Sequence, residues 1–175
     1  MKRFILVVWL VVWASLGWVD VAPWPQLQHD SQRTGRGEYP GPDNPYLKWI
    51  QQLPESKGCS VVIGLNNTSY VAVSEELYAF HQNGNQKWCQ VFAEVIHSCV
   101  VDSNGLIYVA TRAGELVCVR DDETKATIIW SKKISNPFSV PSLSLDEKTV
   151  YVASDDGTLY FVETSNGNIK GSVCV

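Results

Sequence analysis

The chain has 175 residues, enough for one domain, and its 45% hydrophobic and 18% charged residues are typical of a soluble globular protein. The formal net charge of −4, without any basic stripe, excludes electrostatic binding of nucleic acid. Five cysteines, an odd number without Cys-x-x-Cys spacing, exclude a disulfide-dense scaffold and argue against a zinc site. Buried thiols, or one or two disulfides, are expected.

The N-terminus has the organisation of a secretory signal. A basic pair at residues 2–3 precedes an apolar run from Phe4 to Leu16. This run is short for a membrane span of about 20 residues but suits the apolar region of a signal peptide. Cleavage after Gly17 is expected, so residues 1–17 form the signal peptide; an uncleaved anchor is the alternative, because the run can be extended to Val19. Either form predicts export to a secreted or periplasmic location, and only the anchor would contact a membrane.

Three similar segments follow, each reading as two short strands joined by a tight turn. Their tyrosines, Tyr70, Tyr108 and Tyr151, recur at steps of 38 and 43 residues, a period typical of repeat architectures. Both strands of each hairpin are apolar on both faces, so both faces must be covered. A turn of four residues cannot hold the crossover that parallel strands require, so the hairpins are antiparallel. The segments are SYVAVSEELYAF, IYVATRAGELVCV and VYVASDDGTLYFV.

Small antiparallel sheets that cover one another's faces, at about 40–45 residues each, are the blades of a propeller. The predicted fold is all-β: a partial β-propeller of about three four-stranded blades. The blades are expected at residues 51–94, 95–134 and 135–175, behind a lead-in at residues 18–50. No window after the signal sustains a helical period.

Tryptophans recur with the repeat. Trp49, Trp88 and Trp130 are spaced by 39 and 42 residues and are expected to cap the outer strands of successive blades. Gly171 stands where the third copy should have its tryptophan, which predicts a weak outer strand and the least stable copy. The charged run from Arg120 to Lys125 is interpreted as a solvated loop.

The lead-in and repeats resemble proteins with pyrrolo-quinoline-quinone-like propeller repeats. The similarity rests on Trp24-Pro25, Asp30 and Thr34-Gly35, and then on repeat positions such as Leu77-Tyr78-Ala79 and Lys87-Trp88. The resemblance implies a ring of about eight blades. With three copies, an apolar face is left bare at each end of the arc. The missing blades would come from the rest of a longer product or from other chains, and Leu47-Lys48-Trp49 resembles an outer strand whose partners lie in such a C-terminal part.

The sequence gives little support for a catalytic, cofactor-binding or metal-binding site. The resemblance implies that quinone-binding members need an adjacent Cys pair, a calcium held by Glu and Asn, and an Asp base; this chain has no adjacent Cys pair. Asp102, Asn104 and Gly105 begin like a calcium loop, but the later ligand positions fail. Three isolated histidines and the lack of Gly-x-Ser-x-Gly give no support for a nucleophilic triad. No catalytic, cofactor-binding or metal-binding residue is therefore assigned.

The expected function is a non-enzymatic exported scaffold or binding module with a protein partner, similar to the periplasmic propeller of the outer-membrane protein assembly machine. The alternative is a truncated quinone-dependent oxidoreductase of the alcohol or sugar dehydrogenase type, with pyrroloquinoline quinone and calcium as cofactors. Asn66 and Asn67 begin overlapping Asn-x-Ser/Thr sequons, which in a eukaryotic secretory pathway would be glycosylation sites.

Overall fold

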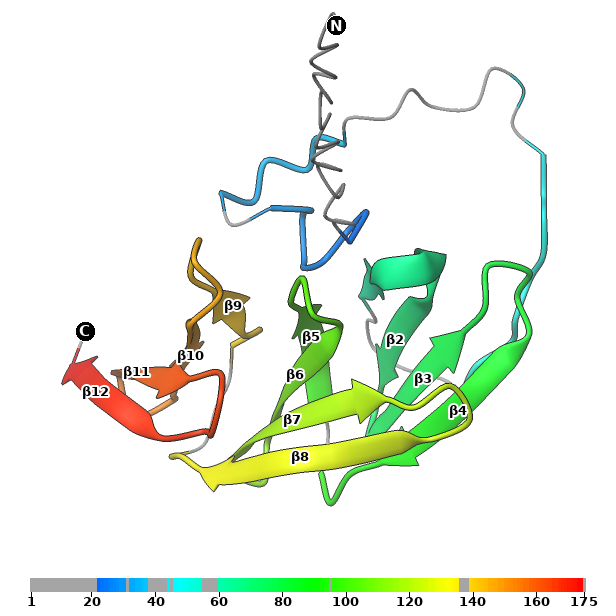
Figure 1. Cartoon of the computed structure of the whole chain (residues 1–175). Coiled ribbons are helices and arrows are strands. Elements are labelled where there is room, and N and C mark those ends of the chain that lie inside the picture. Colours follow the sequence, from blue (N-terminus) through cyan, green and yellow to red (C-terminus); the bar gives the residue numbers. More distant parts are fainter. Residues whose placement is uncertain are drawn as a thin grey trace, which may run out of the picture.

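The computed structural model describes residues 22–30, 32–37, 44, 46–54, 60–94, 96–135 and 139–174. These residues form three separate four-stranded antiparallel sheets, which follow one another in an arc (Figure 1). The prediction of an all-β partial propeller is confirmed. The signal peptide expected at residues 1–17 lies outside the described residues. Within the described part of the chain no helix is long and apolar enough to cross a membrane.

Each sheet, or blade, uses its four strands in chain order. Blade 1 contains β1 (Val61–Ile63), β2 (Ser69–Val73), β3 (Glu76–Phe80) and β4 (Gln86–Val91), with a 3₁₀ turn, η1 (Leu65–Asn67), between its first two strands. Blade 2 contains β5 (Ile96–Val101), β6 (Leu106–Thr111), β7 (Glu115–Asp121) and β8 (Ala126–Lys133). Blade 3 contains β9 (Ser142–Leu143), β10 (Thr149–Ala153), β11 (Thr158–Glu163) and β12 (Ile169–Cys174).

The central hairpin of each blade turns on one residue with positive φ. Gly114 (φ 81°) and Gly157 (φ 79°) serve blades 2 and 3, where glycine adopts this conformation without a steric penalty. The first copy lacks that glycine, and Ser74 adopts φ 51° in its place. The shorter hairpin is therefore still an antiparallel pair, with Tyr70 opposite Ala79.

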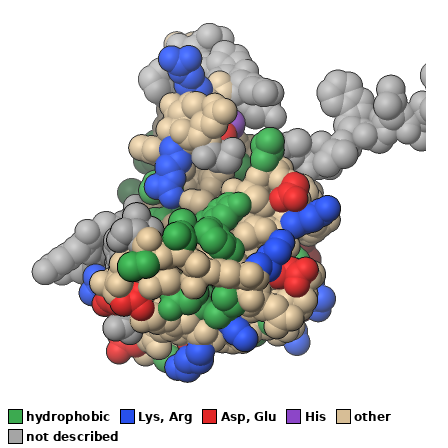
Figure 2. Space-filling model, turned by 90° about the vertical axis from the view of Figure 1, so that its left-hand side faces the viewer, with side chains coloured by type: hydrophobic (Ala, Val, Ile, Leu, Met, Phe, Trp, Pro, Cys, Tyr) green, Lys and Arg blue, Asp and Glu red, His purple; other side chains and the backbone are tan. Residues whose placement is uncertain are grey.

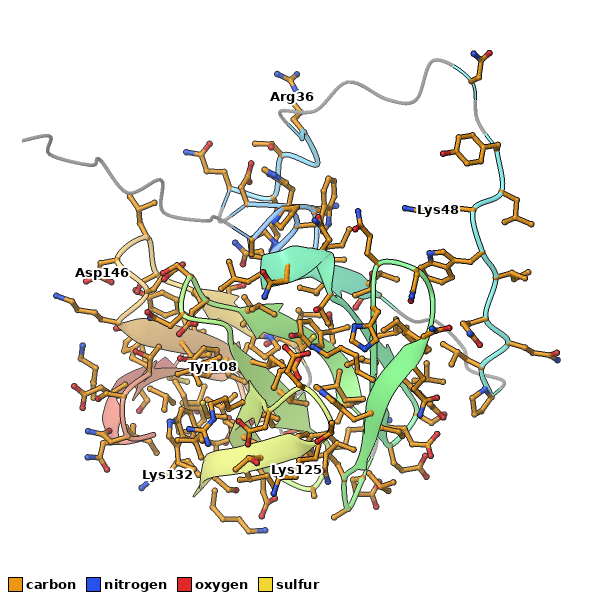
Figure 3. The ribbon with its side chains drawn as sticks, turned by 45° about the vertical axis from the view of Figure 1, so that its right-hand side comes forward. Arg36, Lys48, Tyr108, Lys125, Lys132 and Asp146 are labelled. Atoms are coloured by element: carbon orange, nitrogen blue, oxygen red, sulfur yellow. The ribbon has the colours of Figure 1, made fainter. Side chains whose placement is uncertain are left out.

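The core lies between the blades, because alternate residues of a strand face opposite neighbours. On β6, Ile107 and Val109 pack in the cluster shared with blade 1, whereas Tyr108 and Ala110 pack in the cluster shared with blade 3. All four side chains are at most 1% exposed. Figure 3 shows the labelled Tyr108 inside the molecule, while Lys125 and Lys132 lie at its periphery. Burying a side chain of this size contributes about 1.5–3 kcal/mol, so blade 2 stabilises both of its neighbours.

An N-terminal strap, residues 22–30 and 32–37, crosses the first strands of all three blades. Trp24 and Ile63 of β1 exchange two backbone hydrogen bonds of 3.0 and 2.8 Å. The amide of Val101 in β5 donates to the carbonyl oxygen of Pro25 at 2.8 Å. Nη2 of Arg33 donates to Oγ of Ser142 in β9 at 2.9 Å. The strap, coloured blue in Figure 1, therefore connects three sheets that have no strand in common.

The outer strand expected at Leu47-Lys48-Trp49 stays a prediction, because its expected partner strands belong to a C-terminal part of a longer product. Residues 46–54 form no strand, because no neighbouring strand in the described part of the chain pairs with them. Trp49 nevertheless contacts blade 1, where its Nε1 atom donates to the carbonyl oxygen of Gln82 at 3.0 Å. The labelled Lys48 lies on this extended segment, outside the sheets (Figure 3).

Candidate functional site: the end face of blade 3

Each repeat tryptophan donates a hydrogen bond to the turn before the outer strand of a following blade. Trp49 reaches the carbonyl of Gln82, and Nε1 of Trp130 reaches that of Thr164 at 2.9 Å. Trp88 instead reaches the carboxylate of Asp121, at 2.8 Å. Trp88 and Trp130 lie in outer strands β4 and β8 as expected, and they also fasten one blade to the next.

The interpretation of Arg120 to Lys125 as a solvated loop is wrong for Asp121. Its carboxylate, 10% exposed, accepts hydrogen bonds from Trp88, from the hydroxyl of Tyr70 at 2.9 Å and from Nζ of Lys87 at 2.8 Å. The Lys87 side chain is only 3% exposed. Burial opposes ionisation of Asp121, but the three donors outweigh it and hold the pKa of the carboxyl below its ordinary value. This cluster fastens blade 1 to blade 2.

The same position recurs in blade 3, on which no further blade packs within the described part of the chain. Lys87 and Lys170 each directly precede the tryptophan position of their outer strand, which is Trp88 in blade 1 and Gly171 in blade 3. Lys87 forms ion pairs with the next blade. Among the described residues Lys170 has no ion pair, and its Nζ atom donates to Oγ1 of Thr149 in its own blade at 3.3 Å. Lys170 is thus a cation at the position where the interface between blades 1 and 2 has a salt bridge, whereas blade 2 has Ile129 there.

The strand register places five apolar side chains on the last face of blade 3, which we call the end face. Tyr151 opposes Phe161 across β10 and β11, and Leu159 opposes both Ala153 and Val173. The two rings meet edge to face, with centroids 5.5 Å apart. Val173 is 47% exposed. Figure 2, which views this side of the molecule, shows apolar side chains gathered between basic and acidic groups.

The end face corresponds to surfaces that are covered elsewhere in the arc. Tyr70 of blade 1 and Tyr108 of blade 2, which occupy the repeat position of Tyr151, are 4% and 0% exposed because a following blade packs on them. At the end face a hollow of about 280 Å³ remains between Thr149, Tyr151, Phe161 and Lys170. The prediction of a bare apolar face therefore holds at this end within the described residues. At the other end, Leu53 packs on Val71, Val73 and Phe80 of blade 1.

The two predicted glycosylation residues lie on the surface. Asn66 and Asn67 form part of η1, are exposed, and adopt φ values of 56° and 55°. Asparagine tolerates this left-handed conformation better than most residues, so the turn itself explains both asparagines. Their modification stays a prediction.

The described residues do not fit a quinone–calcium site. No group of three or more His, Cys, Asp or Glu side chains that could hold a metal occurs among them. Cys89, Cys99, Cys118 and Cys174 are free thiols; Cys59 lies outside the described part. The Asp102 carboxylate is already used within its own blade, where it accepts bonds from the amides of Asn104 and Leu106 and from the hydroxyl of Tyr108. We therefore derive no catalytic step from these residues.

Sheets stacked face to face around an arc, with the tryptophan of one fastened to the turn of another, define a β-propeller of the pyrrolo-quinoline-quinone-like repeat class. A family model matches residues 49–171, which is more than half of the chain. The chain belongs to that family, whose description is outer membrane protein assembly factor BamB.

Two solved structures show the same fold at low identity. BamB from Moraxella catarrhalis aligns with a TM-score of 0.53 and 19% identity over 63% of this chain and 35% of that one. Quinohemoprotein alcohol dehydrogenase from Comamonas testosteroni aligns with a TM-score of 0.67 and 16% identity over 86% of this chain and 27% of the enzyme. The chain thus spans about a third of that BamB and about a quarter of the enzyme. None of the curated proteins compared with the sequence matches it.

Proposed function

We propose that this chain is an exported, non-enzymatic scaffold that binds a protein partner through the end face of blade 3. The observation that carries this proposal is the partial exposure of Tyr151, Leu159 and Phe161, whose repeat counterparts in blades 1 and 2 are buried. Aromatic side chains bury about 150–250 Å² each in an interface, so covering this face gives a large hydrophobic gain. The secretory signal expected at residues 1–17 and the family description support export to an extracytoplasmic location.

The chemistry of the partner follows from the interface between blades 1 and 2. There Lys87 pairs with Asp121, so the partner of Lys170 should present a carboxylate on a turn at the edge of a sheet. A second copy of this chain does not provide it. Blade 1 has Gln82 at the position that accepts the tryptophan, and Trp49 already occupies that turn. The partner is therefore another blade with an acidic turn, from a longer product or from a different chain.

Carbodiimide crosslinking tests this proposal, because it joins an amine directly to a carboxylate in contact with it. We expect a crosslink between Lys170 and an Asp or Glu of the partner, mapped by mass spectrometry of complexes from the exported fraction. Phe161→Glu should abolish the crosslink by placing a charge in the apolar face. The matched control, Ile128→Glu, alters an exposed residue of β8 and should leave the Lys170 crosslink intact.

Two results would overturn the scaffold proposal. One is a Lys170 crosslink that persists at full yield in Phe161→Glu. The other is reduction of a redox dye by the purified chain with pyrroloquinoline quinone, calcium and an alcohol or sugar, which would establish the oxidoreductase alternative.

A further inference from the structure

Blade 3 exchanges a large and a small residue between its last two strands. In blades 1 and 2 the tryptophan of the outer strand stands opposite a small residue of the preceding strand. These pairs are Trp88 with Ala79 and Trp130 with Cys118. In blade 3 the order is reversed: Phe161 of β11 stands opposite Gly171 of β12. The blade thus keeps one large ring in the pair, but the ring has moved away from the outer strand.

The moved ring keeps its contact with the repeat tyrosine and leaves space in front of the outer strand. The ring centroids of this contact are 5.9 Å apart in blades 1 and 2, and 5.5 Å apart between Tyr151 and Phe161 in blade 3. The hollow of the end face, about 280 Å³, is lined by Phe161, which is the register partner of Gly171, and by Lys170, which is its neighbour in the chain. A ring on β12 would fill this hollow, whereas the ring on β11 leaves it open.

Blade 3 itself does not require glycine at position 171. Gly171 is not among the glycines with positive φ. A Cβ atom at Gly171 would meet only Cδ2 of Phe161, at 3.6 Å, which is an ordinary contact distance. At Gly167, by contrast, the same atom would lie 2.6 Å from the indole of Trp130. Neither the backbone nor a neighbouring side chain in the described part of the chain therefore requires this glycine, and its effect is to keep the hollow open.

Two of the three donors that bind Asp121 in the interface between blades 1 and 2 recur at the hollow. Those donors are Tyr70, Lys87 and Trp88. Tyr151 and Lys170 occupy the first two of these repeat positions in blade 3. Lys87 and Lys170 are each the extra residue of a β-bulge, which turns the lysine toward the same face as the tryptophan position.

Both donors of the end face can bind a carboxylate. The Tyr151 hydroxyl has no hydrogen bond to a described residue. The Lys170 ammonium has three donors, and its bond to Oγ1 of Thr149 uses one of them. Lys170 is exposed and Tyr151 is half-buried. The hollow thus offers a cation and a hydroxyl beside two aromatic rings, which is the chemistry of an aromatic group that carries a carboxylate close to it.

We propose that this hollow receives an aromatic side chain of the protein partner, next to a carboxylate that binds Lys170 and Tyr151. The inference rests on the proposed function and names the group that the partner inserts. The ring would take the place of the repeat tryptophan, against Phe161 and Tyr151, where edge-to-face or offset packing is favourable. The carboxylate would accept the bonds that Asp121 accepts between blades 1 and 2. The partner segment is therefore a Trp, Tyr or Phe close to an Asp or Glu.

Short peptides titrated into the whole chain test the proposal, with amide chemical shifts measured by nuclear magnetic resonance. Acetyl-Trp-Asp-amide carries both groups, whereas acetyl-Leu-Asp-amide lacks the ring and acetyl-Trp-Asn-amide lacks the charge. We expect saturable shifts at the amides of Lys170 and Gly171, a dissociation constant on the order of 1 mM for the first probe, and about tenfold weaker binding of the other two. Equal binding of the Leu-Asp and Trp-Asp probes would overturn the proposal. Tighter binding of free indoleacetate than of the Trp-Asp probe would overturn the protein segment as the occupant.

Variants of β12 locate the site. Gly171→Trp supplies the ring from the chain itself and should abolish binding of the Trp-Asp probe. The matched control, Ser172→Trp, adds the same ring at the next residue, which is exposed and lies on the opposite face of the strand, and it should leave binding unchanged. Lys170→Gln removes the charge, so the Trp-Asp probe should bind no better than the Trp-Asn probe. Unchanged binding in folded Gly171→Trp would overturn the proposal.

The carbodiimide crosslink separates this inference from the proposed function. Gly171→Trp should also prevent the Lys170 crosslink in the exported fraction, because its indole excludes the ring of the partner. A crosslink that persists at full yield in Gly171→Trp would overturn the inserted ring but leave the scaffold proposal intact. Absence of any Lys170 crosslink in the wild type would instead count against the proposed function itself.

Discussion

Nε1 of Trp88 in blade 1 donates a hydrogen bond of 2.8 Å to Oδ1 of Asp121 in blade 2. The other oxygen of the same carboxylate receives the hydroxyl of Tyr70 and the ammonium of Lys87. Because all three donors belong to blade 1, this one side chain fixes how two sheets sit against each other. Its position at the rim, beyond the apolar core between the blades, also limits the access of water to that core.

Asp121→Ala should destabilise the chain strongly. It leaves the Lys87 ammonium buried, with only the largely exposed Glu123 as an ionic partner at 3.1 Å. Breaking a buried ion pair in this way costs about 3–5 kcal/mol. The measurement is the free energy of unfolding in urea. The control, Lys133→Ala, removes an exposed ion pair of 3.5 Å with Glu115. It should change the free energy of unfolding by less than about 1 kcal/mol. Equal effects of the two variants would contradict the role given to Asp121.

The same carboxylate predicts an acid dependence. The folded-state pKa of Asp121 lies below its ordinary value of 3.8, so its stabilising contribution is complete above about pH 3.8 and is lost as the pH falls through the folded-state pKa. We expect the difference in unfolding free energy between the wild type and Asp121→Asn to be constant from pH 7 to 5 and to shrink below pH 4. Urea titrations of both proteins across this range measure the difference. A difference that does not change with pH would show that the pKa of Asp121 is the same in the folded and the unfolded chain.

The sequence was sufficient to predict the blades but not the contacts between distant segments. Tyr70, Tyr108 and Tyr151 mark the repeat because the same buried position recurs in each sheet. Asp121 was misread because its neighbours in the sequence are charged and solvated, whereas its own burial depends on blade 1. The strap was missed for a related reason: the bond from Val101 to Pro25 joins two backbones and leaves no pattern in side chains.

Hydrogen exchange should distinguish the three blades. The β6–β7 hairpin is covered on both faces, with Tyr108 and Leu116 fully buried, and its amides should exchange most slowly. Strand β12 has no buried residue in its described part, and Gly171 gives it no tryptophan to fasten. Among the strands of the three blades, the amides of β12 should therefore exchange fastest. Mass-spectrometric exchange on peptides from each blade measures this order, and uniform protection across the three hairpins would contradict it.

Gly167→Ala should be more harmful than the equivalent change at Gly105, although both glycines adopt positive φ (74° and 79°). A Cβ atom at Gly167 would lie 2.6 Å from Cε3 of Trp130, whereas at Gly105 it meets only Cδ1 of Leu65 at 3.6 Å. Both variants suffer the backbone strain of about 1–3 kcal/mol. Only Gly167→Ala also displaces the indole, which adds about 1–3 kcal/mol for overpacking.

Unfolding in urea, followed by tryptophan fluorescence, separates these two effects. Gly167→Ala should lower the unfolding free energy further than Gly105→Ala and shift the native emission to the red, because Trp130 loses its hydrogen bond to the carbonyl of Thr164 and becomes more exposed. Gly105→Ala should leave the native emission unchanged. If the two variants lose the same stability, backbone conformation alone accounts for the loss, and the packing of tryptophan on glycine contributes nothing to holding blade 2 against blade 3.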